Sequence, residues 1–200
     1  ISLKYIMDIE WKGIMPAVTT KFLDNDELDI ESFKINIEAQ LDAGVHGVIL
    51  GGSLGESSTL DDYEKIVLLK KTIEIVSGKV PVIMNIAESS TKKAIESAIL
   101  AKENGASGLM ILPPMKYKAD IRETLEFFKK IAANTNLPIM IYNNPVDYGN
   151  EVTLSMFEEL ASIKNIKSVK ESTRNISNIS KMKSKFGDRF KILAGVDTLA

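Results

Sequence analysis

The 200-residue sequence contains no cysteine and only one histidine, and each shortage excludes a type of chemistry. A chain without cysteine forms neither disulfides nor thiolate metal sites, and this composition fits the reducing cytoplasm. Any Ser-His-Asp triad would have to use the lone His46, yet the sequence holds no G-x-S-x-G motif. We therefore expect a cytoplasmic protein whose chemistry depends on residues other than cysteine and histidine, with no metal site.

Long apolar runs and an excess of one charge are also missing. No apolar run approaches the roughly 20 residues that span a bilayer. The 25 basic and 27 acidic residues give a formal net charge of −2, so neither a nucleic-acid surface nor an acidic tail is indicated. We expect no membrane partner and no nucleic-acid partner, but a small-molecule substrate.

The sequence does contain a regular alternation of apolar and amphipathic segments. Seven nearly continuous apolar segments predict strands that are covered on both faces: residues 13–19, 47–52, 80–86, 108–112, 138–143, 166–171 and 190–195. Segments with 3.6-residue apolar spacing predict helices between them: residues 30–43, 61–76, 91–103, 121–133, 153–162 and 176–186.

Seven strand–helix steps predict a parallel α/β protein, either a doubly wound sheet or an eight-stranded barrel. No G-x-G-x-x-G motif follows the first strand and no phosphate loop with G-K-S/T is present, which favours the barrel. We predict a single (β/α)8 TIM-barrel domain over residues 1–200, present only through about the seventh strand. Its last strand and C-terminal helices are expected to be missing.

One lysine, Lys170, stands near the end of the predicted strand 166–171. In barrels, the residues that carry the chemistry lie at the C-terminal ends of the strands. An amine in that position loses hydration, which disfavours the ammonium form and lowers its pKa from about 10.4. A neutral amine attacks carbonyl carbons and forms a Schiff base. Lys170 is thus a candidate nucleophile, although most lysines at strand ends simply extend into solvent.

Other predicted strand ends carry a glycine-rich turn and a tyrosine. Glycines at residues 51, 52 and 55 let backbone N–H groups approach a carboxylate, and Ser53 adds a hydroxyl, although an ordinary loop has the same composition. Tyr142 either packs on a pocket wall or, beside a Schiff-base lysine, relays protons. His46 precedes the second strand and is expected to be structural, at the end of the barrel opposite the pocket.

Three of these segments together resemble the dihydrodipicolinate synthase / N-acetylneuraminate lyase family: Gly52-Ser53-Leu54-Gly55-Glu56-Ser57, Tyr142-Asn143-Asn144-Pro145 and Lys170-Glu171-Ser172. The resemblance runs from about Trp11 to Ala200. It implies a homo-oligomeric (β/α)8 barrel, a tetramer or a dimer, with a C-terminal helical extension. It also implies a Schiff base between lysine and a 2-keto acid such as pyruvate, without a metal or organic cofactor.

The resemblance also implies roles for individual residues. Lys170 would form the Schiff base, and Tyr142 would relay protons. Ser53, with the Leu54 amide beside Gly52, would bind the keto-acid carboxylate. The further substrate-binding positions that it implies are Asp147, Gly195 and Asp197, and Tyr117 is a possible second tyrosine.

The chain departs from the family's lysine-biosynthesis enzymes at three positions. Leu54 replaces the second threonine of the glycine turn, and Pro114-Met115 replaces a tyrosine pair that donates one ring to a neighbouring subunit. Asp147 replaces an arginine that recognises the carboxylate of aspartate semialdehyde. This reversal of charge is expected to repel that substrate.

Several motifs are more similar to a subgroup that deaminates 1-pyrroline-4-hydroxy-2-carboxylate, among them Leu112-Pro113-Pro114-Met115-Lys116-Tyr117 and Ala194-Gly195-Val196-Asp197. Our preferred interpretation is an aldolase-type, lysine-dependent lyase that acts on a small 2-keto acid or cyclic imine. One alternative is 4-hydroxy-tetrahydrodipicolinate synthase, which condenses pyruvate with aspartate semialdehyde. The other is a catalytically silent relative that only binds a keto acid.

Overall fold

The computed structural model describes residues 9–114 and 118–197, and its centre is a single sheet of parallel strands. Six strands pair in sequence order: β1 (Val48–Leu50), β2 (Val82–Ile86), β3 (Gly108–Ile111), β4 (Ile139–Asn143), β5 (Ile166–Glu171) and β6 (Lys191–Ala194). Each strand is parallel to the next. A doubly wound sheet reverses its strand order, whereas a barrel wall keeps it.

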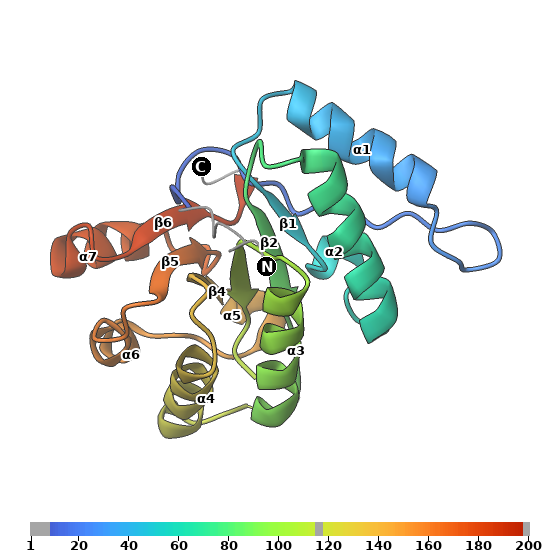
Figure 1. Ribbon diagram of the computed structural model, residues 1–200. Helices are drawn as coiled ribbons and strands as arrows, with labels where there is room; N and C mark the ends of the chain where they lie inside the picture. The colour runs from blue at the N-terminus through green and yellow to red at the C-terminus, as the bar shows by residue number, and fades with distance from the viewer. Residues whose placement is uncertain (1–8, 115–117, 198–200) are drawn as a thin grey trace.

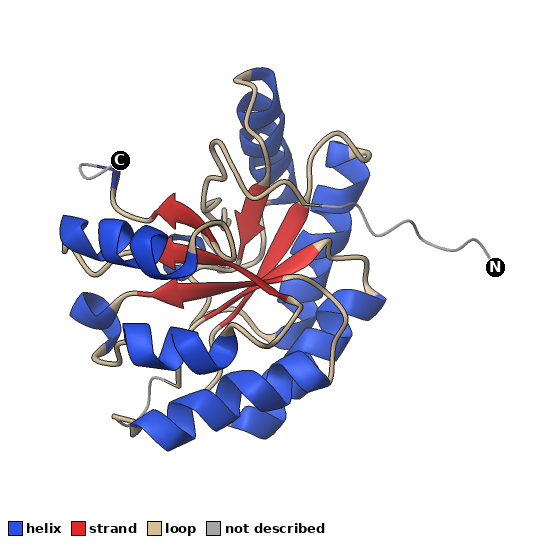
Figure 2. Ribbon diagram, turned by 90° about the vertical axis from the view of Figure 1, so that its left-hand side faces the viewer, coloured by secondary structure: helices blue, strands red, loops and turns tan. Residues whose placement is uncertain are grey.

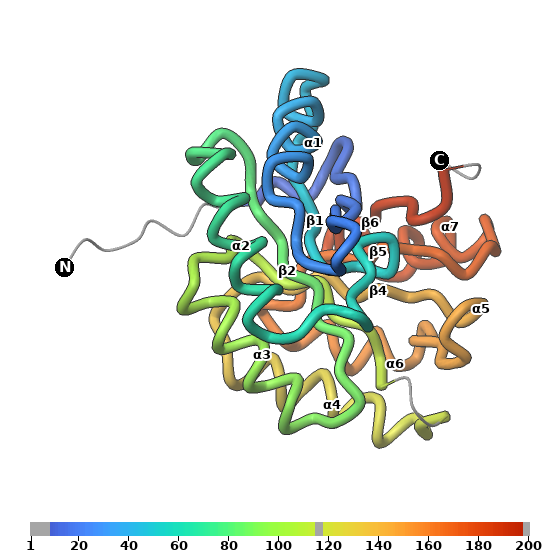
Figure 3. Tube along the Cα trace, turned by 90° about the vertical axis from the view of Figure 1, so that its right-hand side faces the viewer, coloured from blue at the N-terminus to red at the C-terminus, as the bar shows by residue number. Residues whose placement is uncertain are grey.

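Helices surround the sheet on its outer side (Figures 1 and 2). The longer ones are α1 (Ile30–Asp42), α2 (Asp62–Val76), α3 (Thr91–Glu103), α4 (Ile121–Ala133), α6 (Leu154–Leu160) and α7 (Ile176–Phe186). The neighbouring pairs α1–α2, α2–α3, α3–α4 and α4–α6 lie side by side, as Figure 3 shows for α1 and α2. A parallel half-barrel with helices outside confirms the predicted fold class, a (β/α)8 barrel present through about its seventh strand.

Side-chain caps explain why several helix boundaries match those expected from the sequence. α3, α4 and α7 have the predicted bounds, and each begins after a residue whose side chain accepts a backbone N–H: Ser90, Asp120 and Asn175. At α2 the cap is Asp61, which forms a reciprocal capping box with Glu64. The predicted helix 153–162 is shorter in the structure, because Thr153 is its cap and Ala161 ends it.

The first predicted strand, residues 13–19, is wrong as a strand. Its pairing with β1 is reduced to an isolated parallel bridge between Ala17 and Ile49. The Val18 amide donates to the Ile49 carbonyl and the Ile49 amide donates to the Pro16 carbonyl, both at 2.9 Å. Pro16 has no N–H to continue the ladder, and Gly13 has a φ of +77°, so the segment lies where the strand was expected without becoming one.

Alternation along the strands separates two apolar layers. Val48 and Leu50 point outward into the core beneath the helices, whereas Ile49 between them points into the barrel. The inner layer also contains Ile9, Trp11, Ile83, Met110, Leu112, Met140 and Tyr142. A Cβ built on Gly108 would lie 2.7 Å from Ile9 Cδ1, so Ile9 fills the amino end of the barrel where β3 begins. The carboxyl end is left to polar side chains.

Within the described ranges, none of the helices combines the length and apolar character needed to cross a bilayer.

The outer core predicts a large difference between two isoleucines of α1. Ile37 is 0 % exposed and Ile35 is 66 % exposed. Ile37→Ala is expected to lower the free energy of unfolding by about 2–5 kcal/mol, because it leaves a cavity. Ile35→Ala on the same helix should change it by less than about 0.5 kcal/mol. Urea unfolding of both variants measures the difference, and equal effects would contradict the assignment of this face.

Candidate active site

Lys170 and Tyr142 lie side by side at the carboxyl ends of β5 and β4. They are paired in register, and both belong to the set of alternating residues that faces the barrel interior. Lys170 Nζ lies 4.5 Å from the centroid of the Tyr142 ring. Burial lowers the pKa of the Lys170 ammonium, and the charge of Asp197 opposes this shift only in part. The site therefore favours a neutral, nucleophilic amine more than water does.

Tyr142 is buried, and its hydroxyl accepts a hydrogen bond from Asn144 Nδ2 at 3.0 Å. Burial raises the pKa of the Tyr142 phenol, since desolvation disfavours the phenolate, and the Asn144 hydrogen bond opposes the shift. The phenol is thus held in its protonated form beside the lysine, where it can donate a proton and take one back.

Ser53 is connected to Tyr142 by Tyr148, a residue that was not among the predicted site residues. It begins the short 3-10 turn Ser53–Gly55 after β1, and its Oγ is hydrogen-bonded to the hydroxyl of Tyr148. The Tyr148 ring packs edge-on against Tyr142, with centroids 5.9 Å apart and planes at 74°. Tyr148 thus connects Ser53 with Tyr142.

A short helix explains how Tyr148 returns to the strand end. α5 (Pro145–Tyr148) begins with a proline in its first turn and is capped by the Asn144 side chain, which accepts from the Asp147 amide. Gly149, with φ +75°, ends it. The Asn-Pro pair is a recognisable helix-start signal. It predicts one turn of helix here and could have pointed to Tyr148.

The glycine-rich turn after β1 is held by side chains from two neighbouring segments. Thr20 Oγ1 donates to the Gly55 carbonyl and Asn85 Nδ2 donates to the Gly51 carbonyl, each at 2.7 Å. A Cβ built on Gly55 would lie only 2.8 Å from the Val18 carbonyl oxygen, so the turn needs glycine there. Gly52 caps the 3-10 turn, and the Leu54 side chain is 68 % exposed.

Gly195, which follows β6, makes room for the lysine. A Cβ at this position would lie 1.9 Å from Ser172 Oγ and 2.9 Å from Lys170 Cγ. Its amide donates to the Glu171 carbonyl at 2.8 Å. Gly195 therefore lies against the lysine, and Asp197 is near enough for its charge to act on the Lys170 ammonium. The catalytic and substrate-binding roles assigned to the individual residues remain predictions.

A buried carboxylate locks the strand ends on the side facing away from the lysine. Glu171 is 6 % exposed, and its carboxylate accepts hydrogen bonds from Asn178 Nδ2 at 2.8 Å and from the Thr173 amide at 2.8 Å. Asn143 Nδ2 lies 3.4 Å from the same carboxylate and also donates to the Val152 carbonyl. These bonds fix β4 and β5 relative to each other and so set the positions of Tyr142 and Lys170.

Asp147 does not present an isolated negative charge. Its Oδ2 accepts from Asn144 Nδ2 at 2.7 Å, and its Oδ1 lies 3.7 Å from an Nη of Arg174. Arg174, in the loop after β5, was not among the predicted site residues. The charge reversal expected from Asp147 is therefore partly offset by a nearby cation.

Two other sequence predictions concern Tyr117 and His46. Tyr117 lies outside the described residues. His46 Nδ1 accepts the Ile14 amide at 3.2 Å before β1, which agrees with the structural role expected for it. Among residues 9–114 and 118–197, no group of three or more histidine, cysteine or acidic side chains is placed to hold a metal ion.

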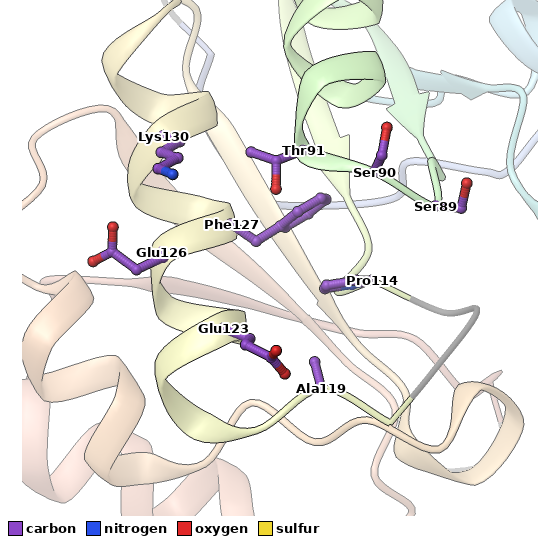
Figure 4. Close-up of a pocket in the computed structure, with 9 residues that line it drawn as sticks. All are labelled: Ser89, Ser90, Thr91, Pro114, Ala119, Glu123, Glu126, Phe127 and Lys130. Atoms are coloured by element: carbon purple, nitrogen blue, oxygen red, sulfur yellow. The ribbon is translucent and has the colours of Figure 1, made fainter.

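A separate pocket of about 360 Å³ lies between α3 and α4 (Figure 4). The start of α3 and one side of α4 form its walls, which contain Ser89, Ser90, Thr91, Pro114, Ala119, Glu123, Glu126, Phe127 and Lys130. None of these nine is a residue predicted for the active site.

The half-barrel places the chain in the (β/α)8-barrel class. Its partly buried lysine and the neighbouring tyrosine lie at the carboxyl ends of the strands, where such barrels carry their active sites. The model of the Dihydrodipicolinate synthetase family matches residues 10–200, and the chain belongs to this family.

Individual relatives agree with this assignment. A 4-hydroxy-tetrahydrodipicolinate synthase from Methanoculleus marisnigri is 34% identical over 192 residues, covering 94% of this chain and 66% of that protein. Dihydrodipicolinate synthase from Aquifex aeolicus superposes with a TM-score of 0.90 at 32% identity, covering 94% of this chain and 64% of that one. YagE, a family member from E. coli K12 solved in complex with pyruvate, superposes with a TM-score of 0.87 at 29% identity. The match covers 92% of this chain and 63% of YagE. The chain thus spans a little under two thirds of the length of these relatives.

The lowered pKa of Lys170 predicts a pH-dependent stability. The folded protein binds the lysine proton less tightly than the unfolded chain does, so the buried ammonium lowers the free energy of unfolding at neutral pH. This free energy rises again as the pH approaches 10.5, the ordinary pKa of lysine. Lys170→Met should therefore unfold at higher urea concentration than the wild type at pH 7, and the difference should shrink by pH 10. Lys167→Met, at an exposed position of the same strand, is the control. A stability difference between Lys170→Met and the wild type that grows with pH would contradict the prediction.

Proposed function

We propose that this protein is a lysine-dependent lyase that forms a Schiff base with a small 2-keto acid or cyclic imine. The observation that carries the proposal is the Lys170 amine, which burial favours in its neutral form and which lies 4.5 Å from the ring centre of Tyr142. Membership in the family supports it.

In the proposed reaction, the substrate carboxylate binds at the glycine turn, where the Ser53 hydroxyl and the backbone around Gly52 and Leu54 supply donors. Lys170 Nζ attacks the C2 carbonyl carbon, the two protons that the amine nitrogen loses pass to the carbinolamine oxygen, and this oxygen leaves as water, which yields the neutral imine. Tyr142 carries these protons, since its raised pKa keeps the phenol protonated until the oxygen needs it.

Tyr148 connects the carboxylate-binding turn with this tyrosine within the same chain. Its hydroxyl is bonded to Ser53 Oγ and its ring packs against Tyr142, so Tyr148 holds Ser53 and Tyr142 in position relative to each other. The family's usual tyrosine pair after the strand-four proline is absent from this sequence. In the family, one ring of that pair comes from a neighbouring subunit. Tyr148 would supply a ring from the same subunit instead.

Two substrates fit this chemistry. In a 1-pyrroline-4-hydroxy-2-carboxylate deaminase, the amine attacks the cyclic imine carbon, the 4-hydroxyl leaves as water and hydrolysis releases ammonia. The second candidate is 4-hydroxy-tetrahydrodipicolinate synthase, and the name of the relative from Methanoculleus marisnigri favours it. The Arg174 cation near Asp147 also weakens the charge argument against an acidic aldehyde. For either substrate we propose a cytoplasmic homo-oligomer that needs no cofactor.

Borohydride trapping tests the Schiff base. The full-length protein treated with pyruvate and borohydride should gain the mass of one reduced adduct, mapped to Lys170 by peptide mass spectrometry. Lys170→Ala should remove both adduct and turnover while the protein stays folded, and Lys167→Ala should keep both. Turnover by folded Lys170→Ala would contradict the mechanism. An adduct without turnover on any candidate substrate would favour the silent keto-acid binder.

The hydrogen bond between Ser53 and Tyr148 predicts a specific defect for Tyr148→Phe. Removing this hydroxyl should lower kcat by about 10²-fold, because a small displacement of a substrate-binding group costs about that much. Because imine formation needs only Lys170 and Tyr142, the fully reduced adduct should still form on long incubation. Tyr63→Phe, which alters a 76 % exposed tyrosine, is the control. An unchanged kcat in Tyr148→Phe would show that this hydrogen bond does not position the site.

A further inference from the structure

Arg174 adopts a backbone conformation that arginine seldom adopts. Its φ is +61°, in the left-handed region that favours glycine. The residue lies between the end of β5 and Asn175, whose own side chain caps α7. The helix cap therefore does not explain why an arginine occupies this position.

The ion pair of Arg174 does not explain it either. The guanidinium is 59% exposed and the partner carboxylate of Asp147 is 53% exposed, at a separation of 3.7 Å. Charge-assisted hydrogen bonds are nearer 2.7–2.9 Å, and exposed pairs of this kind add little to stability. A glycine would relieve the backbone strain at almost no loss of packing. Strained residues that stability does not require cluster at functional sites.

A continuous set of contacts connects Arg174 to the reactive amine. The Lys170 amine contacts the Tyr142 ring, and the Tyr142 hydroxyl accepts from Asn144 Nδ2. The same Asn144 amide nitrogen donates to Asp147, which faces Arg174. Arg174 lies in the loop after β5 and Asp147 in the short helix α5 after the neighbouring strand β4, at the rim of the strand-end site.

We propose that Arg174 is a specificity-determining residue that binds a second substrate carboxylate, distant from the one beside the keto group. This assignment rests on the proposed Schiff-base function. A guanidinium offers a planar fork of donors that matches a carboxylate, and its loose pairing with Asp147 leaves it able to turn toward a ligand. The carboxylate belongs either to a longer keto acid or to an acceptor aldehyde.

Two pairs of probes separate these sources. In the first arm, borohydride trapping at Lys170 compares 2-oxoglutarate with 2-oxopentanoate, which has a methyl group in place of the distal carboxylate. In the second arm, condensation of pyruvate with succinic semialdehyde is compared with condensation with pentanal. Both arms use the full-length protein and the variants Arg174→Gly and Arg174→Lys. Ser77→Gly is the matched control, because Ser77 also has a positive φ, +47°, at the end of α2, outside the residues that form the strand-end site.

In at least one arm, the wild type should prefer the carboxylate-bearing probe, and Arg174→Gly should reduce that preference about tenfold, as expected for one hydrogen-bonded charge pair. Arg174→Lys should retain part of it, and Ser77→Gly all of it. Both glycine variants should raise Tm, because each relieves a strained backbone. The arm that responds identifies which reactant carries the carboxylate.

Two outcomes overturn the assignment, and they are distinguishable. If keto acids are trapped at Lys170 but neither preference changes in Arg174→Gly, the carboxylate assignment fails alone. A fall in Tm for Arg174→Gly with unchanged preferences would show that the arginine is structural. If the wild type traps no keto acid, including pyruvate, the proposed function fails and this assignment fails with it.

Discussion

The site depends on one constraint: Lys170 and Tyr142 are in register on neighbouring parallel strands and face the same side of the sheet. Side chains alternate along a strand, so a shift of one residue in either strand would turn one of the two outward into the helix-facing core. The inward position removes water from the amine and disfavours its charge, and the same burial holds the phenol protonated. A single register thus shifts the pKa of both groups, downward for the ammonium and upward for the phenol.

The rest of the structure preserves this register and the space around it. Glu171 and Asn143 alternate with the site residues and join the two strand ends on the opposite face. Gly195 leaves the volume that the lysine side chain fills, and the capped turn α5 carries Asp147 and Tyr148 back over the strand ends. A charged group can be partly buried here because the polar neighbours that surround it are themselves fixed by hydrogen bonds.

Local signals account for most of what the sequence predicted well. Apolar runs located the six strands, and side-chain caps such as Ser90 and Asp120 fixed the helix starts. The first strand failed for a local reason as well, since Pro16 cannot continue a ladder. Candidate residues at strand ends could be named because parallel strands bring their carboxyl ends together, which placed Ser53, Tyr142 and Lys170 at one edge of the sheet.

The sequence by itself determined the order of strands and helices, the fold class and the edge of the sheet where the polar residues gather. Composition and periodicity act over a few residues, and the parallel topology follows from them. Only the tertiary structure decided the contact between Ser53 and Tyr148, 95 positions apart, and the pairing of Asp147 with Arg174. Such contacts depend on how the short helix α5 and the left-handed backbone of Arg174 orient the segments after β4 and β5. The direction of a side chain there is set by the neighbours that pack against it rather than by the residues that precede it.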